Sequence, residues 1–330
     1  MTISTMTDVW IIWKKTRNKK VSGKNMLFEY HFHGCVGHKT IELNRTAYEE
    51  MSVFLKENGE TDAFLATFSA APVDNLVECL EFCRALMADA PLPGAQLAGV
   101  YLEGPFVHVA GGMTESLLAK PSVEAAKRLV EAGRGIIRNV TVAPELPGAL
   151  PVIEYFASEG IHVSAGHFCC TPEVLNDAVS AGVSSITHFC NNGEGPLQNE
   201  NGLYFTDGPF LDILADDRLT VEMICDGVHV NPKLVKTVWR TKGREKFIAI
   251  TDGCAATGMP GKRLVFSDPV GTPAEFDVRN GALYIADTDQ LTGSLATMKR
   301  IYDNLIKFCG MSEADALYAC SGLPRKTAGV

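Results

Sequence analysis

The chain has 330 residues, of which 46% are hydrophobic and 21% charged, and its formal net charge is −9 at pH 7. This composition is typical of a soluble globular protein, and the length suffices for one large barrel or two medium domains. The one basic cluster lies near the start, at 13–20 (WKKTRNKK). The acidic balance therefore argues against nucleic acid and against a membrane surface as partners.

The ten cysteines are irregularly spaced. No hydrophobic signal segment opens the sequence, and no apolar run reaches membrane-spanning length. Cysteines in a chain of this kind are typically buried thiols in a reducing compartment, so we expect a cytoplasmic location. The adjacent Cys169 and Cys170 have no second pair at zinc-site spacing and are interpreted as structural.

A regular alternation of strand-like and helix-like patterns begins near residue 26. Parallel βα units have this signature, and eight of them over roughly 250 residues predict a (β/α)8 barrel of the TIM type. We therefore expect an N-terminal extension or remnant β segment at 1–25, the barrel at 26–330 and a β insert at 262–288. The eight predicted strands are 26–32, 61–68, 97–104, 137–145, 161–167, 184–189, 220–227 and 247–253.

Polar side chains stand at the carboxyl end of six of these strands. Barrel enzymes build their active sites at this end, from the ends of several different strands. Burying so many polar groups without partners would cost several kcal/mol each, so a common partner is expected, and a divalent metal fits. The residues concerned are His31, His33, Glu103, His167, His188, Asp226 with His229 just beyond it, and Asp252.

Histidine and carboxylate ligands suit zinc, with iron(II), cobalt or manganese as alternatives. His31 and His33 are two residues apart, and alternation along a strand places such residues on the same side. A catalytic metal site activates water, and Asp252 would then serve as general base and later as general acid. The pattern predicts metal-assisted hydrolysis of an amide or a related carbonyl compound.

Eight short stretches, in order, resemble the amidohydrolase superfamily and within it the N-acetylglucosamine-6-phosphate deacetylases. The resemblance covers roughly residues 26 to 325. The stretches are HFHG (31–34), YLEGPF (101–106), VAPE (142–145), SAGH (164–167), THFCNN (187–192), CDGVHV (225–230), ITDGCAATGMPG (250–261) and LTGSLATM (291–298).

The resemblance implies a role for each matched residue. It implies that Glu103, His167 and His188 hold the principal metal. In some members the positions of His31 and His33 hold a second metal with Glu103 as the bridge, so one or two ions per chain are expected. The remaining matches are Asp252 as catalytic acid/base, Asn191, the backbone at Asn192 and His229 as contacts to the sugar or its phosphate, and Leu291 and Thr292 as backbone contacts to the substrate.

The sequence departs from the family pattern in three places. A family histidine that polarises the acetyl carbonyl is replaced near Met113 or Thr114, and His108 has the wrong offset. The family arginine that pairs with the substrate phosphate, often from a neighbouring subunit, is replaced by Asn199. Both ends are short, so the accessory β-sandwich of the family is expected to be reduced or incomplete.

The resemblance implies removal of the acetyl group from an N-acetylated amino sugar, with N-acetylglucosamine 6-phosphate as the expected substrate. An alternative is an amidohydrolase acting on an unphosphorylated N-acetyl sugar, an N-acyl amino acid or a cyclic amide. A more distant alternative is a non-catalytic barrel that binds a sugar. A homodimer is expected because family members are commonly dimers.

Overall fold

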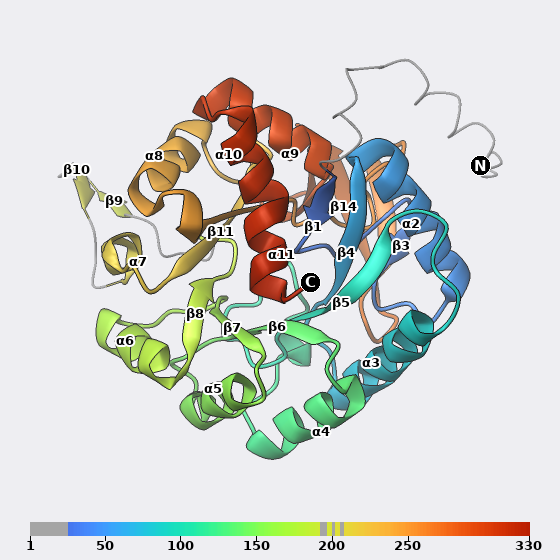
Figure 1. The fold of residues 1–330 in the computed structure, drawn as a ribbon, viewed down its shortest axis with the longest axis horizontal. Coiled ribbons are helices and arrows are strands. Elements are labelled where there is room, and N and C mark those ends of the chain that lie inside the picture. Colours follow the sequence, from blue (N-terminus) through green and yellow to red (C-terminus); the bar gives the residue numbers. More distant parts are fainter. Residues whose placement is uncertain (1–25, 192–196, 200–201, 205–207) are drawn as a thin grey trace.

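The computed structural model describes residues 26–191, 197–199, 202–204 and 208–330 (Figure 1). Two predictions from the sequence therefore lie outside the described residues: the N-terminal extension at 1–25 and the substrate contact of Asn192. Asn199 lies in a described strand, but its side chain is outside the described part.

Eight parallel strands form the central sheet, and each corresponds to one of the predicted strands. Just beyond the two edge strands, Phe32 and Gly253 form a parallel bridge, and the amide of His33 donates to the carbonyl oxygen of Gly253 at 2.8 Å. These contacts close the sheet, so the predicted (β/α)8 barrel is confirmed. In sheet order the strands are β1 (Leu27–Glu29), β4 (Thr61–Phe68), β5 (Gln96–Glu103), β6 (Ile137–Val142), β7 (His162–Ala165), β8 (Val183–Ile186), β11 (Thr220–Ile224) and β12 (Phe247–Ile250).

Helices surround the barrel as an outer ring (Figure 1). Several begin at a side chain that accepts a hydrogen bond from the first turn, such as Ser122 before α4 and Thr171 before α6. Caps of this kind stabilise a helix by about 1 kcal/mol each. The helices are α2 (Arg45–Gly59), α3 (Val73–Ala88), α4 (Val123–Gly133), α5 (Ala149–Ser158), α6 (Pro172–Ala181), α7 (Phe210–Ala215), α8 (Pro232–Lys242), α9 (Met298–Asn304), α10 (Glu313–Leu317) and α11 (Leu323–Ala328).

A four-stranded antiparallel sheet follows the last barrel strand. Three of its strands lie within 262–288, and the fourth carries Leu291 and Thr292. A bridge between Gly253 and Ser294 joins this sheet to the rim of the barrel. Its strands are β13 (Arg263–Ser267), β14 (Pro273–Arg279), β15 (Ala282–Ile285) and β16 (Leu291–Ser294), and two shorter antiparallel pairs are β2 (Gly34–Cys35) with β3 (His38–Lys39) and β9 (Leu197–Asn199) with β10 (Gly202–Tyr204).

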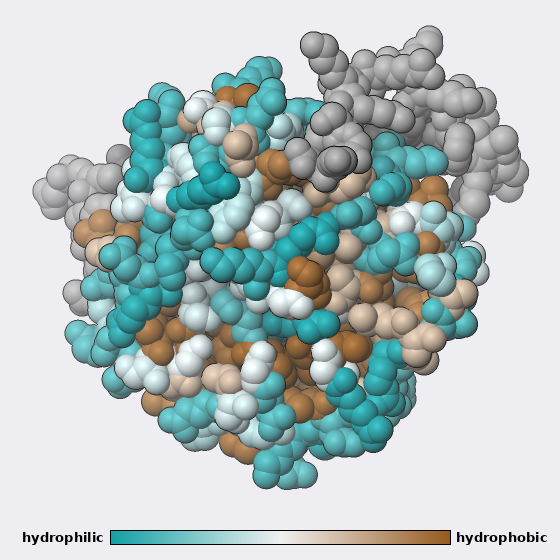
Figure 2. Space-filling view, viewed as in Figure 1, coloured by the Kyte–Doolittle hydropathy of each residue, from teal (hydrophilic) through white to brown (hydrophobic). Residues whose placement is uncertain are grey.

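Apolar side chains pack in two places, between the strands and the helix ring and inside the barrel lumen. The lumen cluster includes Phe28 and Ile248 near the strand starts, and Leu323 and Ala328 of α11 pack against it. Figure 1 shows α11 lying across this end of the barrel, so the amino-terminal end is closed. The same face is largely hydrophilic, with apolar residues gathered in its lower half (Figure 2).

All ten cysteines lie among the described residues, and no disulfide bond is found among them. In the described part of the chain, no helix is both long enough and apolar enough to cross a membrane.

Candidate active site

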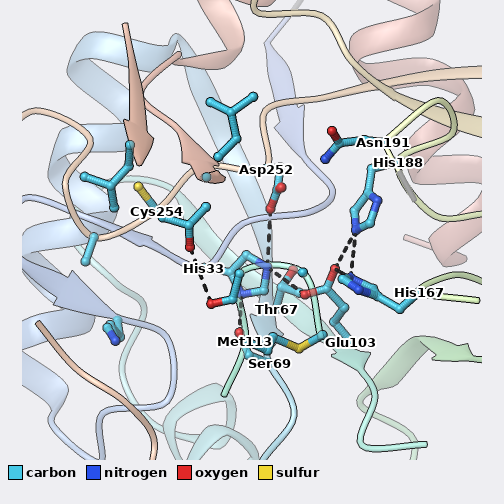
Figure 3. Close-up of a pocket in the computed structure, with 18 of the residues that line it drawn as sticks. His33, Thr67, Ser69, Glu103, Met113, His167, His188, Asn191, Asp252 and Cys254 are labelled. Atoms are coloured by element: carbon cyan, nitrogen blue, oxygen red, sulfur yellow. Dashed lines mark hydrogen bonds and ion pairs between the residues drawn. The ribbon is translucent and has the colours of Figure 1, made fainter. Parts of the chain in front are cut away.

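The polar residues predicted from the sequence meet at the carboxyl end of the barrel, and Figure 3 labels His33, Glu103, His167, His188 and Asp252 among them. Glu103 is the last residue of β5, whereas His31 and His33 follow β1. His167 and His188 each lie two residues beyond the last residue of β7 and β8, and Asp252 lies two residues beyond β12. The shared position after the strands explains how residues from five strands reach one point.

Three of these residues have a left-handed backbone. The φ angle is 52° at His167, 27° at His188 and 51° at Asp252. Residues other than glycine pay about 1–2 kcal/mol for this conformation. Strain of this kind concentrates at functional sites, where the surrounding structure holds side chains in a required direction.

The Glu103 carboxylate lies at the centre of the cluster and is almost completely buried. Its Oε1 atom is 3.1 Å from Nε2 of His167 and 2.8 Å from Nε2 of His188. Its Oε2 atom is 3.1 Å from Nε2 of His33. Burial alone would raise the pKa of Glu103, but the nearby histidines, His31 and His33 foremost, hold it well below the usual value. Glu103 is therefore an anionic bridge between two groups of histidines.

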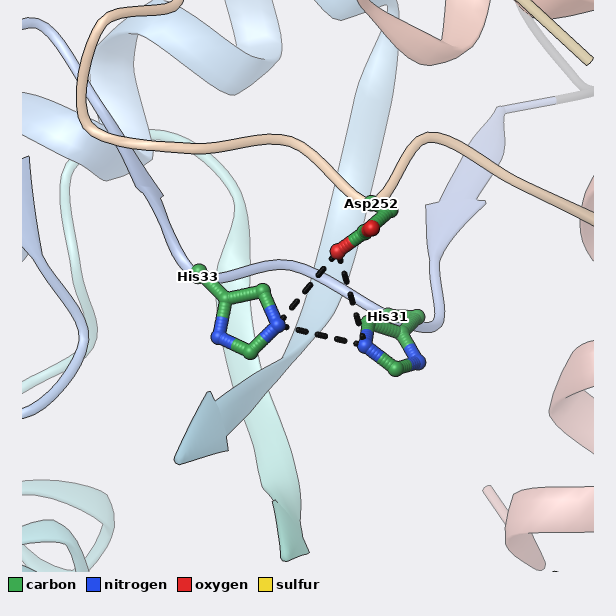
Figure 4. A group of neighbouring side chains, drawn as sticks. All are labelled: His31, His33 and Asp252. Atoms are coloured by element: carbon green, nitrogen blue, oxygen red, sulfur yellow. Dashed lines mark hydrogen bonds and ion pairs between the residues drawn. The ribbon is translucent and has the colours of Figure 1, made fainter. Parts of the chain in front are cut away.

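The second group consists of His31, His33 and Asp252 (Figure 4). The two histidine Nε2 atoms are 3.2 Å apart, and Oδ1 of Asp252 is 3.6 Å from the first and 3.4 Å from the second. Burial would raise the pKa of Asp252, but its contact with His33 and the charge of His31 lower it below the usual range. This carboxylate is therefore held in its anionic form, which suits contact with a cation.

Two triads of donor atoms fit divalent cations. In the described residues, the donors of Glu103, His167 and His188 lie within 4.8 Å of one another, and so do those of the second group. The Nε2 atoms of His167 and His188 are only 3.1 Å apart and face the same oxygen. Such convergence of nitrogen and oxygen donors suits zinc, iron(II), cobalt or manganese.

Outer contacts orient the histidine rings. Nδ1 of His167 donates to the carbonyl oxygen of Val109 at 2.7 Å, so the other ring nitrogen, Nε2, faces the cluster. Nδ1 of His33 lies 3.1 Å from the hydroxyl oxygen of Ser69. Metal-binding histidines typically have outer partners of this kind.

A cavity of about 590 Å³ opens above the cluster. Its volume is in the range of small-molecule sites. Loops after the barrel strands and the small antiparallel sheet together form its walls. Besides the clustered side chains His33, Glu103, His167, His188 and Asp252, the lining includes Lys39, Thr40, Ile41, Gly111, Gly112, Met113, Cys169, Asn191, His229, Cys254, Phe266, Phe276, Gln290, Leu291 and Thr292.

The predicted substrate contacts that the structure describes all line this cavity. They are Asn191, His229, Leu291 and Thr292. Nδ1 of His229 donates to Oδ2 of Asp226 at 2.7 Å. Burial would lower the pKa of His229, but this bond to Asp226 raises it, which favours a cationic ring.

The residues near the position of the family histidine do not supply a histidine to the cluster. Met113 lines the cavity, and its sulfur accepts from the amide of Ala70 at 3.3 Å. The hydroxyl of Thr114 donates to Asp268 at 3.2 Å. His108 is half-exposed and pairs with Glu145 at 2.8 Å. Within the described residues, none of these three belongs to either candidate metal-binding group.

Sequence reasoning missed two residues of this region. Lys39 lines the cavity from β3, and its ammonium group donates to the carbonyl oxygen of Ser267. Glu222 is buried inside the barrel below His31. A signal for Glu222 was present, because a carboxylate inside the apolar run TVEMI is unusual.

The barrel and the histidine–carboxylate cluster at its carboxyl rim define a hydrolase of the amidohydrolase class. The chain is 30% identical over 308 residues to the N-acetylglucosamine-6-phosphate deacetylase of Bacillus subtilis, and the match covers 92% of this chain and 74% of that protein. The chain belongs to the N-acetylglucosamine-6-phosphate deacetylase family.

Two further comparisons support this assignment. The N-acetylgalactosamine-6-phosphate deacetylase of Escherichia coli O157:H7 is 26% identical over 302 residues, with 91% of this chain and 76% of that protein covered. The N-acetyl-D-glucosamine-6-phosphate deacetylase of Mycobacterium smegmatis, solved in complex with N-acetyl-D-glucosamine-6-phosphate, matches with a TM-score of 0.80 and 28% identity over 93% of this chain and 77% of that one. No family model matches the chain.

Proposed function

We propose that this enzyme hydrolyses the acetamide of N-acetylglucosamine 6-phosphate to glucosamine 6-phosphate and acetate. The observation that carries this proposal is the placement of Asp252 beside the Glu103-centred histidine cluster, at the floor of a cavity of about 590 Å³. A chain of this family with a complete donor set is suited to amide hydrolysis.

Glu103, His167 and His188 would hold the principal ion, most simply Zn²⁺, and His31 with His33 a second one. A divalent cation there supplies an acidified water molecule and polarisation of the acetyl carbonyl. Asp252 accepts the proton of the attacking water. It then returns this proton to the amine nitrogen as the carbon–nitrogen bond breaks, so that acetate and a free amine leave.

His229 and Asn191 are proposed to bind the sugar or its phosphate, together with the backbone of Leu291 and Thr292. The raised pKa of His229 supports contact with an anion. A contact between the backbone at Asn192 and the substrate is proposed from the sequence alone. A homodimer and a cytoplasmic location stay predictions.

The phosphate needs a cation, because the family arginine is replaced by Asn199. Lys39 is the single lysine or arginine among the described residues that line the cavity. We assign it to the phosphate or to another anionic group of the substrate. Without such a contact, the alternative of an unphosphorylated N-acetyl sugar would be favoured, because a missing guanidinium weakens phosphate binding.

The experiment is acetate release by metal-loaded protein from N-acetylglucosamine 6-phosphate and from N-acetylglucosamine at equal concentration. A clear preference for the phosphate ester is expected. Lys39→Met should raise the KM for N-acetylglucosamine 6-phosphate about 10-fold or more. The same variant should leave turnover of the plain sugar unchanged. N-acetylgalactosamine 6-phosphate tests the sugar epimer in parallel.

Turnover of the plain sugar alone would replace the proposed substrate by an unphosphorylated one. If metal is bound and neither sugar is hydrolysed, other N-acyl compounds and cyclic amides become the substrates to test. An absence of metal in protein purified without chelator would favour the non-catalytic alternative.

A further inference from the structure

Glu222 is a carboxylate in the middle of β11 that faces the barrel lumen and has no exposed surface. Burying a carboxylate costs several kcal/mol unless other groups compensate. No residue of the proposed mechanism explains its presence there. Barrel interiors are usually filled by bulky branched side chains, whereas the side chains around Glu222 are polar.

Four side chains from four different strands hold this carboxylate. The hydroxyl of Tyr101 lies 3.2 Å from both carboxylate oxygens. The amide of Asn139 donates to Oε1 at 3.3 Å and the hydroxyl of Ser164 at 3.1 Å, while the hydroxyl of Ser185 is 3.5 Å away. These donors fix Oε1 firmly, whereas Oε2 contacts the Tyr101 hydroxyl and one other group among the described residues.

That neighbour is His31. Oε2 of Glu222 is 3.5 Å from Nδ1 of His31, and both side chains are fully buried. This nitrogen has no hydrogen-bond partner among the described residues. On the opposite edge of the ring, Nε2 is 3.3 Å from Glu103 and 3.6 Å from Asp252. His31 therefore lies between a carboxylate of the lumen and the two carboxylates of the site.

We propose that Glu222 is a positioning residue for the second metal subsite, formed by His31, His33 and Asp252. Nδ1 of His31 lies 3.5 Å from Oε2 of Glu222, and with the ring proton on Nδ1 the Nε2 lone pair would face the subsite. Histidines that bind metals typically donate their other nitrogen to a carboxylate in this way. The occupancy of the second subsite thus depends on a residue inside the barrel. This inference rests on the metal centre of the proposed function.

The test is a titration of metal-free full-length protein with Zn²⁺, followed by calorimetry and by metal analysis after desalting. The unaltered protein should bind two ions per chain. Glu222→Gln should weaken one of them by about 10–100-fold and leave the other unchanged, the range found for an outer carboxylate partner. His31→Ala should lose the same ion, and Glu222→Gln should add no further loss in that background.

Ser164→Ala is the matched control, because Ser164 contacts Glu222 but not His31. It should keep both ions, whereas a merely structural role of the lumen carboxylate would make it resemble Glu222→Gln. If Glu222→Gln fails to fold, Glu222→Asp keeps the charge but withdraws it from His31, and the same selective loss is expected. Two ions bound with unaltered affinity in the glutamine or aspartate variant would overturn the proposal, as would a single ion in the unaltered protein.

The titration uses no substrate, so it separates this inference from the proposed function. Selective loss of one ion together with failure to release acetate would support the role of Glu222 and contradict deacetylation. Acetate release, together with retention of both ions in Glu222→Gln, would support deacetylation and contradict the role of Glu222.

Discussion

Nδ1 of His167 donates to the carbonyl oxygen of Val109 at 2.7 Å, so a loop of the cavity wall holds the ring of a proposed metal ligand. The same loop contains Gly111, whose φ is +58°. A Cβ atom there would lie 3.1 Å from Cε1 of His167. Because the loop both bonds to the ring and packs against it, a shift of the loop should also shift the ring.

We expect Gly111→Ala to displace the His167 ring and weaken metal binding. The substitution should also cost about 1–2 kcal/mol of folding stability, because alanine disfavours positive φ. Metal content per chain and thermal unfolding measure the two effects separately. Gly135→Ala is the matched control, since Gly135 has φ +85° and a Cβ atom there would have no neighbour within 4 Å. It should lose stability but keep its metal; equal metal content in both variants would contradict this role of the loop.

Glu103→Gln should remove metal from both groups, because its two carboxylate oxygens face different histidines. The loss of affinity should exceed about 100-fold, beyond the range of an outer partner. Metal analysis after desalting measures it. The control is Glu145→Gln, whose carboxylate bonds to His108 and to the amide of Cys169. Retention of both ions by Glu103→Gln would rule out its proposed bridging role.

Asp252→Asn should separate catalysis from binding. Asparagine occupies the same volume but cannot accept the proton of water, so kcat should fall by about 10²–10⁴-fold. The ion held by Glu103, His167 and His188 should stay. Acetate release and metal content are measured on the same sample. Unchanged turnover would show that another group acts as the base, and loss of all metal would show that Asp252 is mainly a ligand.

His38 lies away from the metal groups and gives a prediction for pH. Its ring nitrogens are each 3.0 Å from a carboxylate, of Glu42 and of Glu50. Burial would lower the pKa of His38, but these two carboxylates raise it. A raised folded-state pKa means that the ion pairs stabilise the protein fully below the unfolded value near 6.5, and that this stabilisation is lost as pH rises through the folded pKa.

His38→Gln should therefore lower the thermal midpoint at pH 6, and the difference from the unaltered protein should shrink toward pH 9. Partly exposed pairs contribute less than about 1 kcal/mol, so the shift should be at most about 2–4 °C. Thermal unfolding at the two pH values is the measurement. In a background of Glu42→Gln with Glu50→Gln, the substitution should show no pH-dependent difference. A difference that grows with pH would have the wrong sign for this interpretation.

The strands, and the convergence of the candidate ligands at one rim, could be predicted from the sequence because both have local signals. An apolar run followed by a histidine or carboxylate predicts a strand and the rim position at once, as in LFEYHFH and VYLEG. The predicted first strand was 26–32, whereas β1 ends at Glu29 and only a single bridge at Phe32 continues it. His31 and His33 nevertheless converge, because the backbone beyond β1 stays close to Gly253, just beyond β12.

Contacts across the barrel could not be predicted in this way. Both faces of a barrel strand are buried, so alternation does not tell which residue of another strand Glu222 meets. The contact of Val109 with His167 depends on the shape of a loop, and the residue types of His188 and Asp252 are only a weak signal for positive φ. The antiparallel sheet was visible as strand-like runs, but its contribution to the cavity through Phe266 and Phe276 was not.

The helix α11 that closes the amino-terminal end of the barrel has a consequence for biosynthesis. Two residues before this helix, the hydroxyl of Ser321 donates to the carbonyl oxygen of Met26, 295 residues earlier, and Leu323 of the helix packs into the lumen cluster. A nascent chain emerges from the ribosome from its N-terminus onward. The segment that contacts the first strand through Ser321 is therefore synthesised only after almost the entire barrel. Contacts this distant in sequence slow folding. Until α11 is released, the floor of the barrel stays open, and its aromatic residues are exposed to chaperones and to other unfinished chains.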